Sequence, residues 1–474
     1  MIRSWRMAVP ARYPRQRTIL QRRYHSSNDE RVVVALSGGV DSSVALGLLQ
    51  SQRRDSLSAI YMSNWNLYDD DSVQCTTEVD WNDAQAVARH FQCPILRVAL
   101  EAEYWTCVFE PFLDGLSSQQ MGNPDIACNT YIKFGALLEI VKKRYGPDTV
   151  LATGHYARLW SPNREAAPPF LQAVLDNDST GLVHWVRESS LESNASILLA
   201  AADSSKDQSY FLSGCCGQAL RDACFPLGDL YKSTHHSQDA RTVRQLAMEW
   251  KIPVANKKDS TGICFVGKRR SFRDFLLQNH YLPQAHAPVD FIDVDTQHVV
   301  GTTAPNNAHP VLFTPGQGAK ISGSPTKYFV VGILEPTPAS HHHRVGVCAG
   351  THHPALYADT LFLHNIHWIT GCLPPHLGNG QSLRLKCRIR HLQPLQDCTL
   401  SYDDAGTFRL TFDLPLRGIT SGQQAVLYDP SGLVCLGGGP IGTRGPSLFE
   451  MGLPMPQEVA PAGHNDRSVL SMSS

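Results

Sequence analysis

The stretch that decides the fold of this chain is Arg31-Val32-Val33-Val34-Ala35-Leu36, followed directly by Ser37-Gly38-Gly39-Val40-Asp41-Ser42-Ser43. A continuous run of β-branched and aliphatic residues is typical of a strand buried on both faces of a parallel sheet. The residues that follow predict a helix as far as Gln50. The two glycines let the backbone approach an anion closely at the N-terminus of that helix. The stretch therefore predicts an α/β domain with a phosphate-binding loop after its first strand.

Further strands and helices alternate after this unit. The apolar patterns predict strands at 59–62, 94–98 and 149–152, and helices at 80–90 and 131–144. Strand–helix alternation of this kind is typical of a doubly wound parallel sheet. We expect this α/β catalytic domain to span residues 30–272, with residues 161–202 as a surface insertion, because Pro, Asn, Ser and Asp interrupt any period there.

The rest of the chain has a different character. From residue 273 onward, short segments are separated by Pro and Gly, which predicts a small central domain over 273–352. Strand patterns at 382–390, 407–414 and 425–428 predict a C-terminal β domain, barrel-like, over 353–442. Residues 443–474 are rich in Pro, Ser and Gly and are expected to form a disordered tail.

Composition excludes several classes of protein. The chain has 474 residues, of which 42% are apolar and 18% charged, and no run of 18 apolar residues, so neither a disordered chain nor a transmembrane helix is expected. Seven of its 42 basic side chains are arginines within residues 1–28, where no acid occurs, so the rest of the chain has a net charge of −8. An Arg-rich, acid-free N-terminus is typical of a mitochondrial transit peptide, here over residues 1–29, although a plain basic tail has the same composition.

The thirteen cysteines do not suggest a disulfide framework or a metal centre. They are odd in number and scattered, and no CxxC pair occurs. Structural zinc and iron–sulfur sites normally use such closely spaced pairs. No metal site is therefore expected.

The loop of residues 37–43 has the chemistry of a phosphate site. Its three serines can donate to phosphate oxygens, and Asp41 can stabilise the first helical turn or hold Mg²⁺. The pattern is neither the dinucleotide GxGxxG nor the Walker GxxxxGK[ST] sequence. It resembles the PP-loop of ATP pyrophosphatases, which implies that ATP with Mg²⁺ is cleaved to AMP and diphosphate. The alternative is an ordinary turn between a strand and a helix.

Four other segments carry reactive or binding side chains. Residues 61–65 (YMSNW) can shape an adenine pocket or simply pack in the core, and residues 152–156 (ATGHY) end a strand where α/β proteins bind ligands. Residues 123–129 (NPDIACN) put Cys128 near a helix N-terminus, which lowers the pKa of a thiol, with Asp125 as a neighbouring acid or base. Residues 257–265 (KKDSTGICF) put Cys264 after two lysines. Either cysteine can equally be a buried apolar residue.

Taken together, these motifs identify a resemblance to the tRNA-specific 2-thiouridylase family, of the mitochondrial kind. The resemblance runs from about residue 31 to residue 441. It rests on SGGVDSS, NPDIACN, ATGHY, SKDQSYFL (205–212), KKDSTGICF and VCLGGGPI (434–441). The two cysteine motifs, in this order, distinguish this family from other PP-loop proteins.

The resemblance implies a reaction and its participants. ATP adenylates the C2 oxygen of the wobble uridine of tRNA, and a persulfide on Cys264 provides the sulfur. Cys128 acts as nucleophile or resolving thiol, either releasing sulfide or pairing with Cys264, and Asp125 is the acid/base. The implied sulfur donor is a cysteine desulfurase or persulfide relay, and the implied tRNAs read Lys, Glu and Gln codons. The implied compartment is the mitochondrial matrix, with no membrane partner and no permanently bound cofactor.

The resemblance also implies binding residues. The ATP contacts would be Ala35, Leu36, Ser37, Gly38, Gly39, Val40, Asp41, Ser42, Met62 and Gly154. The tRNA contacts would be Asn123, Pro124, Asp125, His155, Lys206, Asp207, Gln208, Arg388, Ile389 and Gln423. Ile389 stands where the family often has an aromatic residue, which puts base stacking there in doubt.

A stripe of cations supports RNA binding independently of the resemblance. Arg384, Lys386, Arg388 and Arg390 alternate with apolar residues, and a period of two puts all four on one face of a strand. This face can contact phosphates or can simply be solvated.

Two other functions remain open at this point. The chain can be another PP-loop ATP pyrophosphatase, such as a tRNA lysidine synthetase or a small-molecule ligase, in which case both cysteines are dispensable. It can also be an inactive tRNA-binding relative that does not consume ATP.

Overall fold

A computed structural model describes residues 31–51, 56–65, 76–233, 241–258, 276, 281, 287–303, 309–335, 342–402 and 406–456. Among them, no helix combines the length and apolarity needed to cross a membrane. The N-terminal segment expected to be a transit peptide lies outside the described residues.

The first domain is built on a five-stranded sheet in the order β3-β2-β1-β4-β7, in which every pairing is parallel. Its strands are β1 (Val32–Ala35), β2 (Leu57–Ser63), β3 (Ile95–Ala99), β4 (Val150–Ala152) and β7 (Ala223–Cys224). The order reverses direction between β1 and β4, and in open α/β sheets ligands bind outside the strand ends at such a switch point. This confirms the predicted doubly wound α/β fold.

Helices cover both faces of this sheet. Val32 and Val34 of β1 are buried in one apolar cluster and Val33 in another, as the alternation of side chains along a strand requires. The first cluster includes residues of α2 (Val40–Gln50), α3 (Thr76–His90) and α12 (Val243–Glu249). The second includes residues of a long helix made of α6 (Pro124–Ala127), the π-helical segment η2 (Cys128–Leu137) and α7 (Leu138–Tyr145). The same cluster also includes residues of α4 (Glu101–Tyr104), the π-helical segment η1 (Trp105–Phe109), α5 (Glu110–Ser117), α10 (Ser209–Leu212) and α11 (Gly217–Arg221).

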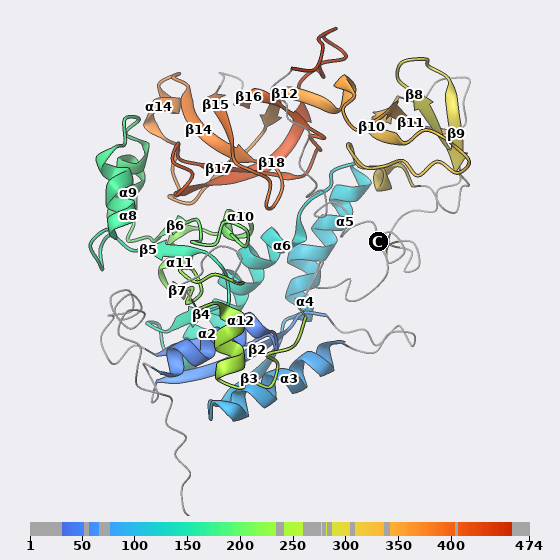
Figure 1. The fold of residues 1–474 in the computed structure, drawn as a ribbon. Coiled ribbons are helices and arrows are strands. Elements are labelled where there is room, and N and C mark those ends of the chain that lie inside the picture. The colour runs from blue at the N-terminus through green and yellow to red at the C-terminus, as the bar shows by residue number, and fades with distance from the viewer. Residues whose placement is uncertain are drawn as a thin grey trace, which may run out of the picture.

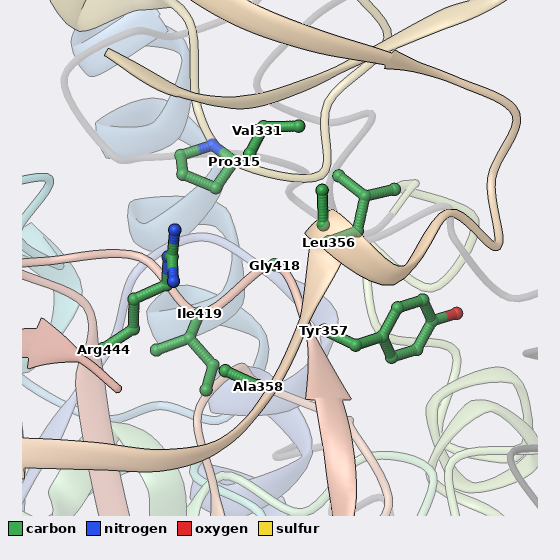
Figure 2. Close-up of a pocket in the computed structure, with 9 residues that line it drawn as sticks. Pro315, Val331, Leu356, Tyr357, Ala358, Gly418, Ile419 and Arg444 are labelled. Carbon is green, nitrogen blue, oxygen red and sulfur yellow. The ribbon is translucent and has the colours of Figure 1, made fainter. Parts of the chain in front are cut away.

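A second, four-stranded sheet follows, in the order β10-β11-β8-β9. Its strands are β8 (Val289–Asp293), β9 (Val299–Thr303), β10 (Tyr328–Leu334) and β11 (His343–Ala349). It has its own small core around Val289, Val330 and Val345. In Figure 1 this yellow sheet lies beside the barrel, and Figure 2 shows a small cavity between them, lined by Pro315 and Val331 on one side and Ile419 and Arg444 on the other.

The third unit is a barrel that closes because β12 pairs with both β16 and β18. Its strands are β12 (Tyr357–Leu363), β13 (His367–Trp368), β14 (Leu383–Arg388), β15 (Gln396–Tyr402), β16 (Phe408–Arg417), β17 (Gln424–Tyr428) and β18 (Cys435–Arg444). The three strands expected from the sequence pattern are all present. The described residues of this part of the chain also form the short helix α14 (Pro375–Gly378) and two 3₁₀ turns, Pro310–Leu312 and Pro354–Leu356.

Two expectations about irregular segments differ from the structure. Residues 161–202 form α8 (Pro169–Asp176), α9 (Leu182–Glu192) and β6 (Ile197–Leu199), which pairs with β5 (Arg158–Trp160). Their apolar side chains share one core with the barrel, beside which α8 and α9 lie in Figure 1. These helices are short and their ends are polar, so the sequence of this segment has no sustained helical period of apolar residues.

The expected disordered tail also begins too early. Residue 443 is still within β18, and Leu448 is buried and donates its backbone N–H to the Tyr357 carbonyl at 2.9 Å. Residues 457–474 lie outside the described residues.

Candidate functional site

The loop after β1 has the geometry of an anion-binding turn. Gly38 has φ of +73°, and a Cβ there would lie 2.3 Å from the carbonyl oxygen of Asp80, so only glycine fits. Gly39 is the N-cap of α2 and has no side chain to accept the first N–H groups of the helix, while the Ser43 hydroxyl donates to the Gly39 carbonyl at 2.7 Å. The hydroxyl of Ser42 instead accepts from the backbone N–H of Ser37 at 3.2 Å and lies 3.1 Å from the Ser37 hydroxyl. The loop thus combines a helix N-terminus with hydroxyl groups, as phosphate sites do.

Gly154 and Met62 come to the same edge of the sheet from β4 and β2. A Cβ on Gly154 would lie 2.7 Å from the backbone nitrogen of Ser42, so this glycine allows the loop and the end of β4 to touch. Met62 is half-buried near the carboxyl end of β2. The predicted ATP residues 35–42, 62 and 154 are therefore brought together by the parallel strands.

Asp41 is held by Tyr156, the last residue of the segment 152–156, and by Lys232, which no sequence motif links to the site. Its Oδ1 accepts from the Tyr156 hydroxyl at 2.8 Å and from Lys232 Nζ at 2.5 Å. Lys232 is buried, and it also donates its backbone N–H to Asp203. In the chain Lys232 lies 191 positions after Asp41, and the sequence alone has no signal that joins them.

A second lysine contacts the other side of the loop. Lys257 Nζ donates to the Gly38 carbonyl at 3.1 Å, to Asp80 at 2.7 Å and to Asp83 at 2.6 Å. Burial lowers the pKa of Lys257, but the hydrogen bonds and charges of the two aspartates outweigh it, and the net shift is upward. The loop has no lysine of its own, so its nearby cations come from distant segments.

The helix that carries Cys128 begins with a well-formed cap. Asn123 accepts the Asp125 backbone N–H on its side chain at 3.0 Å, and Pro124 follows at the first helical position. Cys128 is buried where the helix becomes π-helical, a form that is often found at functional sites. Its place near the helix N-terminus agrees with the sequence prediction.

Lys133 influences the charge state of this site. Its Nζ donates to Asn129 Oδ1 at 2.8 Å, and Asn129, which is buried, donates in turn to the Phe211 carbonyl. Burial raises the pKa of Asp125, and the charge of Lys133 partly opposes that shift. Cys215, another buried thiol, has its pKa raised to about 12, chiefly by burial.

His155 is buried and faces aromatic rings. Its Nδ1 lies 2.7 Å from the Thr153 hydroxyl, and its ring lies 6.0 Å from that of Phe134 and 5.6 Å from that of Phe225. Burial, and then the charge of Lys133, hold the pKa of His155 well below its usual value. The imidazole is therefore neutral and cannot attract a phosphate as a cation.

The segment Lys206-Asp207-Gln208 is held between the first domain and the barrel. Asp207 is buried, accepts from the backbone N–H groups of Ala201 and Ser209, and lies 3.4 Å from Arg388 Nη1. Gln208 accepts the Tyr156 backbone N–H on Oε1 at 2.9 Å. Of the three, Lys206 and Gln208 are partly exposed.

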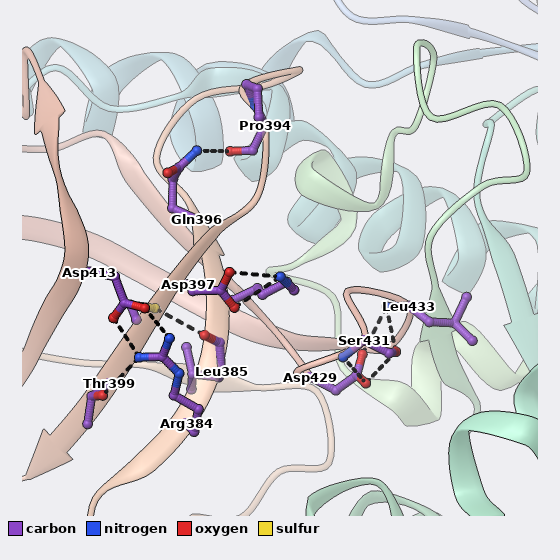
Figure 3. Close-up of polar contacts among 12 residues, drawn as sticks. Arg384, Leu385, Pro394, Gln396, Asp397, Thr399, Asp413, Asp429, Ser431 and Leu433 are labelled. Atoms are coloured by element: carbon purple, nitrogen blue, oxygen red, sulfur yellow. Dashed lines mark hydrogen bonds and ion pairs between the residues drawn. The ribbon is translucent and has the colours of Figure 1, made fainter. Parts of the chain in front are cut away.

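The predicted cation stripe is not a free surface. Figure 3 shows Arg384 bonded to Asp413, and Lys386 is similarly bonded to Asp397 at 3.0 Å. Arg388 is buried beside Asp207 of the first domain, Ile389 is buried in the core that the barrel shares with residues 161–202, and Arg390 donates to the Gly418 carbonyl. The alternation does put Arg384, Lys386 and Arg388 on one face of β14, but each of them is paired with an aspartate, from β16, β15 and residue 207 respectively.

Gln423 lies at the same junction. Its Nε2 donates to the Met121 carbonyl at 2.8 Å, and the Met121 backbone N–H donates to the Ser421 carbonyl at 3.0 Å. These bonds hold the segment before Asn123 against the barrel. Cys264 lies outside the described residues, and among the described ones no group of three or more His, Cys, Asp or Glu side chains is arranged to hold a metal.

Comparison with known proteins agrees with this arrangement. Residues 30–268 match the family described as tRNA methyl transferase HUP domain, and residues 358–441 match the aminomethyltransferase beta-barrel domain. The chain is 37% identical to the human mitochondrial tRNA-specific 2-thiouridylase 1, over 89% of this chain and 92% of that protein. It is 36% identical to the Drosophila melanogaster protein of that name, over 88% and 94%. It is 38% identical to the tRNA-specific 2-thiouridylase MnmA of Methylibium petroleiphilum, over 88% and 99%. The chain therefore belongs to the tRNA-specific 2-thiouridylase family.

Proposed function

We propose that this protein is a tRNA uridine 2-sulfurtransferase that uses ATP with Mg²⁺ to activate the wobble uridine. One observation carries the proposal: the segment after β4 contacts both halves of the site. Gly154 lies against Ser42 of the loop, and the neighbouring His155 ring faces Phe134 of the helix that carries Asp125 and Cys128. A nucleotide on the loop and a base beside Cys128 would then be neighbours.

The chemistry that we propose begins with activation of the uridine and continues with transfer of sulfur. First, the uridine C2 oxygen attacks the α-phosphate of ATP, and diphosphate leaves. The Cys128 thiolate then attacks the inner sulfur of a persulfide on Cys264. A disulfide forms between the two cysteines as the persulfide S–S bond breaks, and hydrosulfide is released. Hydrosulfide adds at C2, AMP leaves with the oxygen, and an external thiol reduces the disulfide. Asp125 would exchange protons with the uracil.

The remaining assignments also belong to this proposal. ATP would contact residues 35–42, Met62 and Gly154, and the target base would meet Asn123, Pro124 and Asp125. Lys206, which is partly exposed, is the member of 206–208 best able to reach a phosphate. For Asp207, Arg388 and Ile389, burial argues for a structural role instead. We further propose tRNAs that read Lys, Glu and Gln codons, a persulfide donor, and import into the mitochondrial matrix through residues 1–29.

The proposal is tested by thiolation in vitro. The full chain is incubated with unmodified tRNA, ATP–Mg²⁺ and a persulfide donor, and the digested tRNA is analysed for 2-thiouridine by mass spectrometry. We expect ATP-dependent product that is lost in Cys128→Ser and Cys264→Ser but kept in Cys216→Ser, which changes an exposed cysteine. Thiolation-independent AMP formation that survives in both serine variants would favour another PP-loop enzyme. Binding of tRNA without AMP formation would favour an inactive relative.

A further inference from the structure

One chain of hydrogen bonds runs from the candidate ATP loop to the segment 206–208. The Tyr156 hydroxyl donates to Asp41 Oδ1 at 2.8 Å. The backbone of the same residue is bonded twice to Gln208: its N–H donates to Gln208 Oε1 at 2.9 Å, and its carbonyl accepts the Gln208 N–H at 2.7 Å. Tyr156 is therefore fixed at both ends.

The surroundings make this connection rigid. Tyr156 is 2% exposed, so its hydroxyl has little water to replace the bond to Asp41. Lys232 bonds the same oxygen of Asp41, and its Nζ lies 5.8 Å from the centre of the Tyr156 ring. On the other side, the residue before Gln208 is the buried Asp207, which lies 3.4 Å from Arg388 of the barrel. A displacement of residues 206–208 would therefore move Tyr156 and disturb its hydrogen bond to Asp41.

We propose that Tyr156 is a positioning residue that fixes Asp41 for ATP binding and joins the loop to the segment 206–208. The inference rests on the proposed use of ATP, and it assigns to Gln208 a second role besides any contact with tRNA. It requires that changes at Tyr156 and Gln208 alter ATP binding even when no tRNA is present.

The test compares three variants of the full chain. Tyr156→Phe removes only the hydroxyl that bonds Asp41. Gln208→Met removes the side-chain acceptor that bonds Tyr156. Tyr357→Phe is the matched control, because this buried tyrosine also bonds one side chain through its hydroxyl, 3.3 Å from His352, but lies in the barrel. The dissociation constant for ATP–Mg²⁺ is measured by calorimetry without tRNA, and thermal unfolding without ATP checks that each variant is folded.

We expect Tyr156→Phe to weaken ATP binding about tenfold, which corresponds to about 1.4 kcal/mol. Gln208→Met should weaken it in the same direction, and Tyr357→Phe should leave it within about twofold. Unchanged ATP affinity in a folded Tyr156→Phe protein would overturn the inference. A Gln208→Met protein that binds ATP normally and only requires more tRNA would overturn the connection between the two sites. If the unaltered protein binds no ATP, the proposed function fails, and this inference with it.

Discussion

At the scale of single residues, Asp125 has the signature of a group kept for function at a cost in stability. Burial raises the pKa of this half-buried carboxyl, and Lys133 only partly compensates. A carboxyl with a raised pKa favours the folded state most when it is protonated, and this contribution is lost as the pH rises through its folded-state pKa. At neutral pH the ionised Asp125 carboxylate therefore lowers the free energy of unfolding.

This predicts opposite effects of Asp125→Asn on stability and activity. We expect thiolation to fall by about a hundredfold or more, as for loss of a general acid or base. Thermal unfolding at pH 7 should shift upward, and the gain should vanish below about pH 3.9, where the unfolded carboxyl is also protonated. Asp114→Asn, which changes an exposed acid on α5, is the control and should alter neither. Full thiolation by Asp125→Asn would remove this residue from the mechanism.

At the scale of elements, β14 shows how one strand face can hold cations in different environments. Arg384 and its partner Asp413 are 45% and 51% exposed, whereas the side chains of Arg388 and Asp207 are 9% and 2% exposed. Exposed pairs contribute about 0–1 kcal/mol, while removal of one partner from a buried pair costs about 3–5 kcal/mol. The Arg388 guanidinium also lies 5.0 Å from the centre of the Tyr428 ring.

We therefore expect Arg388→Met to lower the free energy of unfolding by about 3 kcal/mol, and Arg384→Met by less than about 1 kcal/mol. Both are measured by urea denaturation of the same preparation, followed by circular dichroism. If Arg388→Met leaves the unfolding curve unchanged but weakens tRNA binding in a filter assay, this arginine faces RNA after all. The comparison separates the structural role from the tRNA contact implied by the family resemblance.

At the scale of the whole molecule, the segment 161–202 belongs to the core that it shares with the barrel. Leu182 of α9 is fully buried in the cluster that also contains Leu361 and Leu385 of barrel strands. The isolated bridge between Leu199 and Val434 adds a backbone contact between β6 and the barrel. Helices at this position therefore contribute to how the two domains are joined.

Substitution of two leucines of α9, one buried and one partly exposed, tests whether this segment stabilises the fold. Leu182→Ala should lower the free energy of unfolding by about 2–5 kcal/mol, because it leaves a cavity. Leu191→Ala should cost less than about 1 kcal/mol, because Leu191 is 36% exposed and leaves no enclosed space. Equal, small effects of both substitutions on chemical denaturation would mean that the segment is only a surface insertion.

The sequence by itself determined the features that depend on neighbouring residues. The valine run of β1, the glycines after it and the segment 123–129 predicted a parallel sheet, a phosphate loop and a thiol near a helix N-terminus, because each signal lies within a short stretch of sequence. Only the tertiary structure decided which distant groups meet. Lys232 and Lys257 reach the loop, Asp207 pairs with Arg388, and α9 packs on the barrel. Such contacts depend on how strands and helices are ordered in space, and a local pattern of residues does not contain that order.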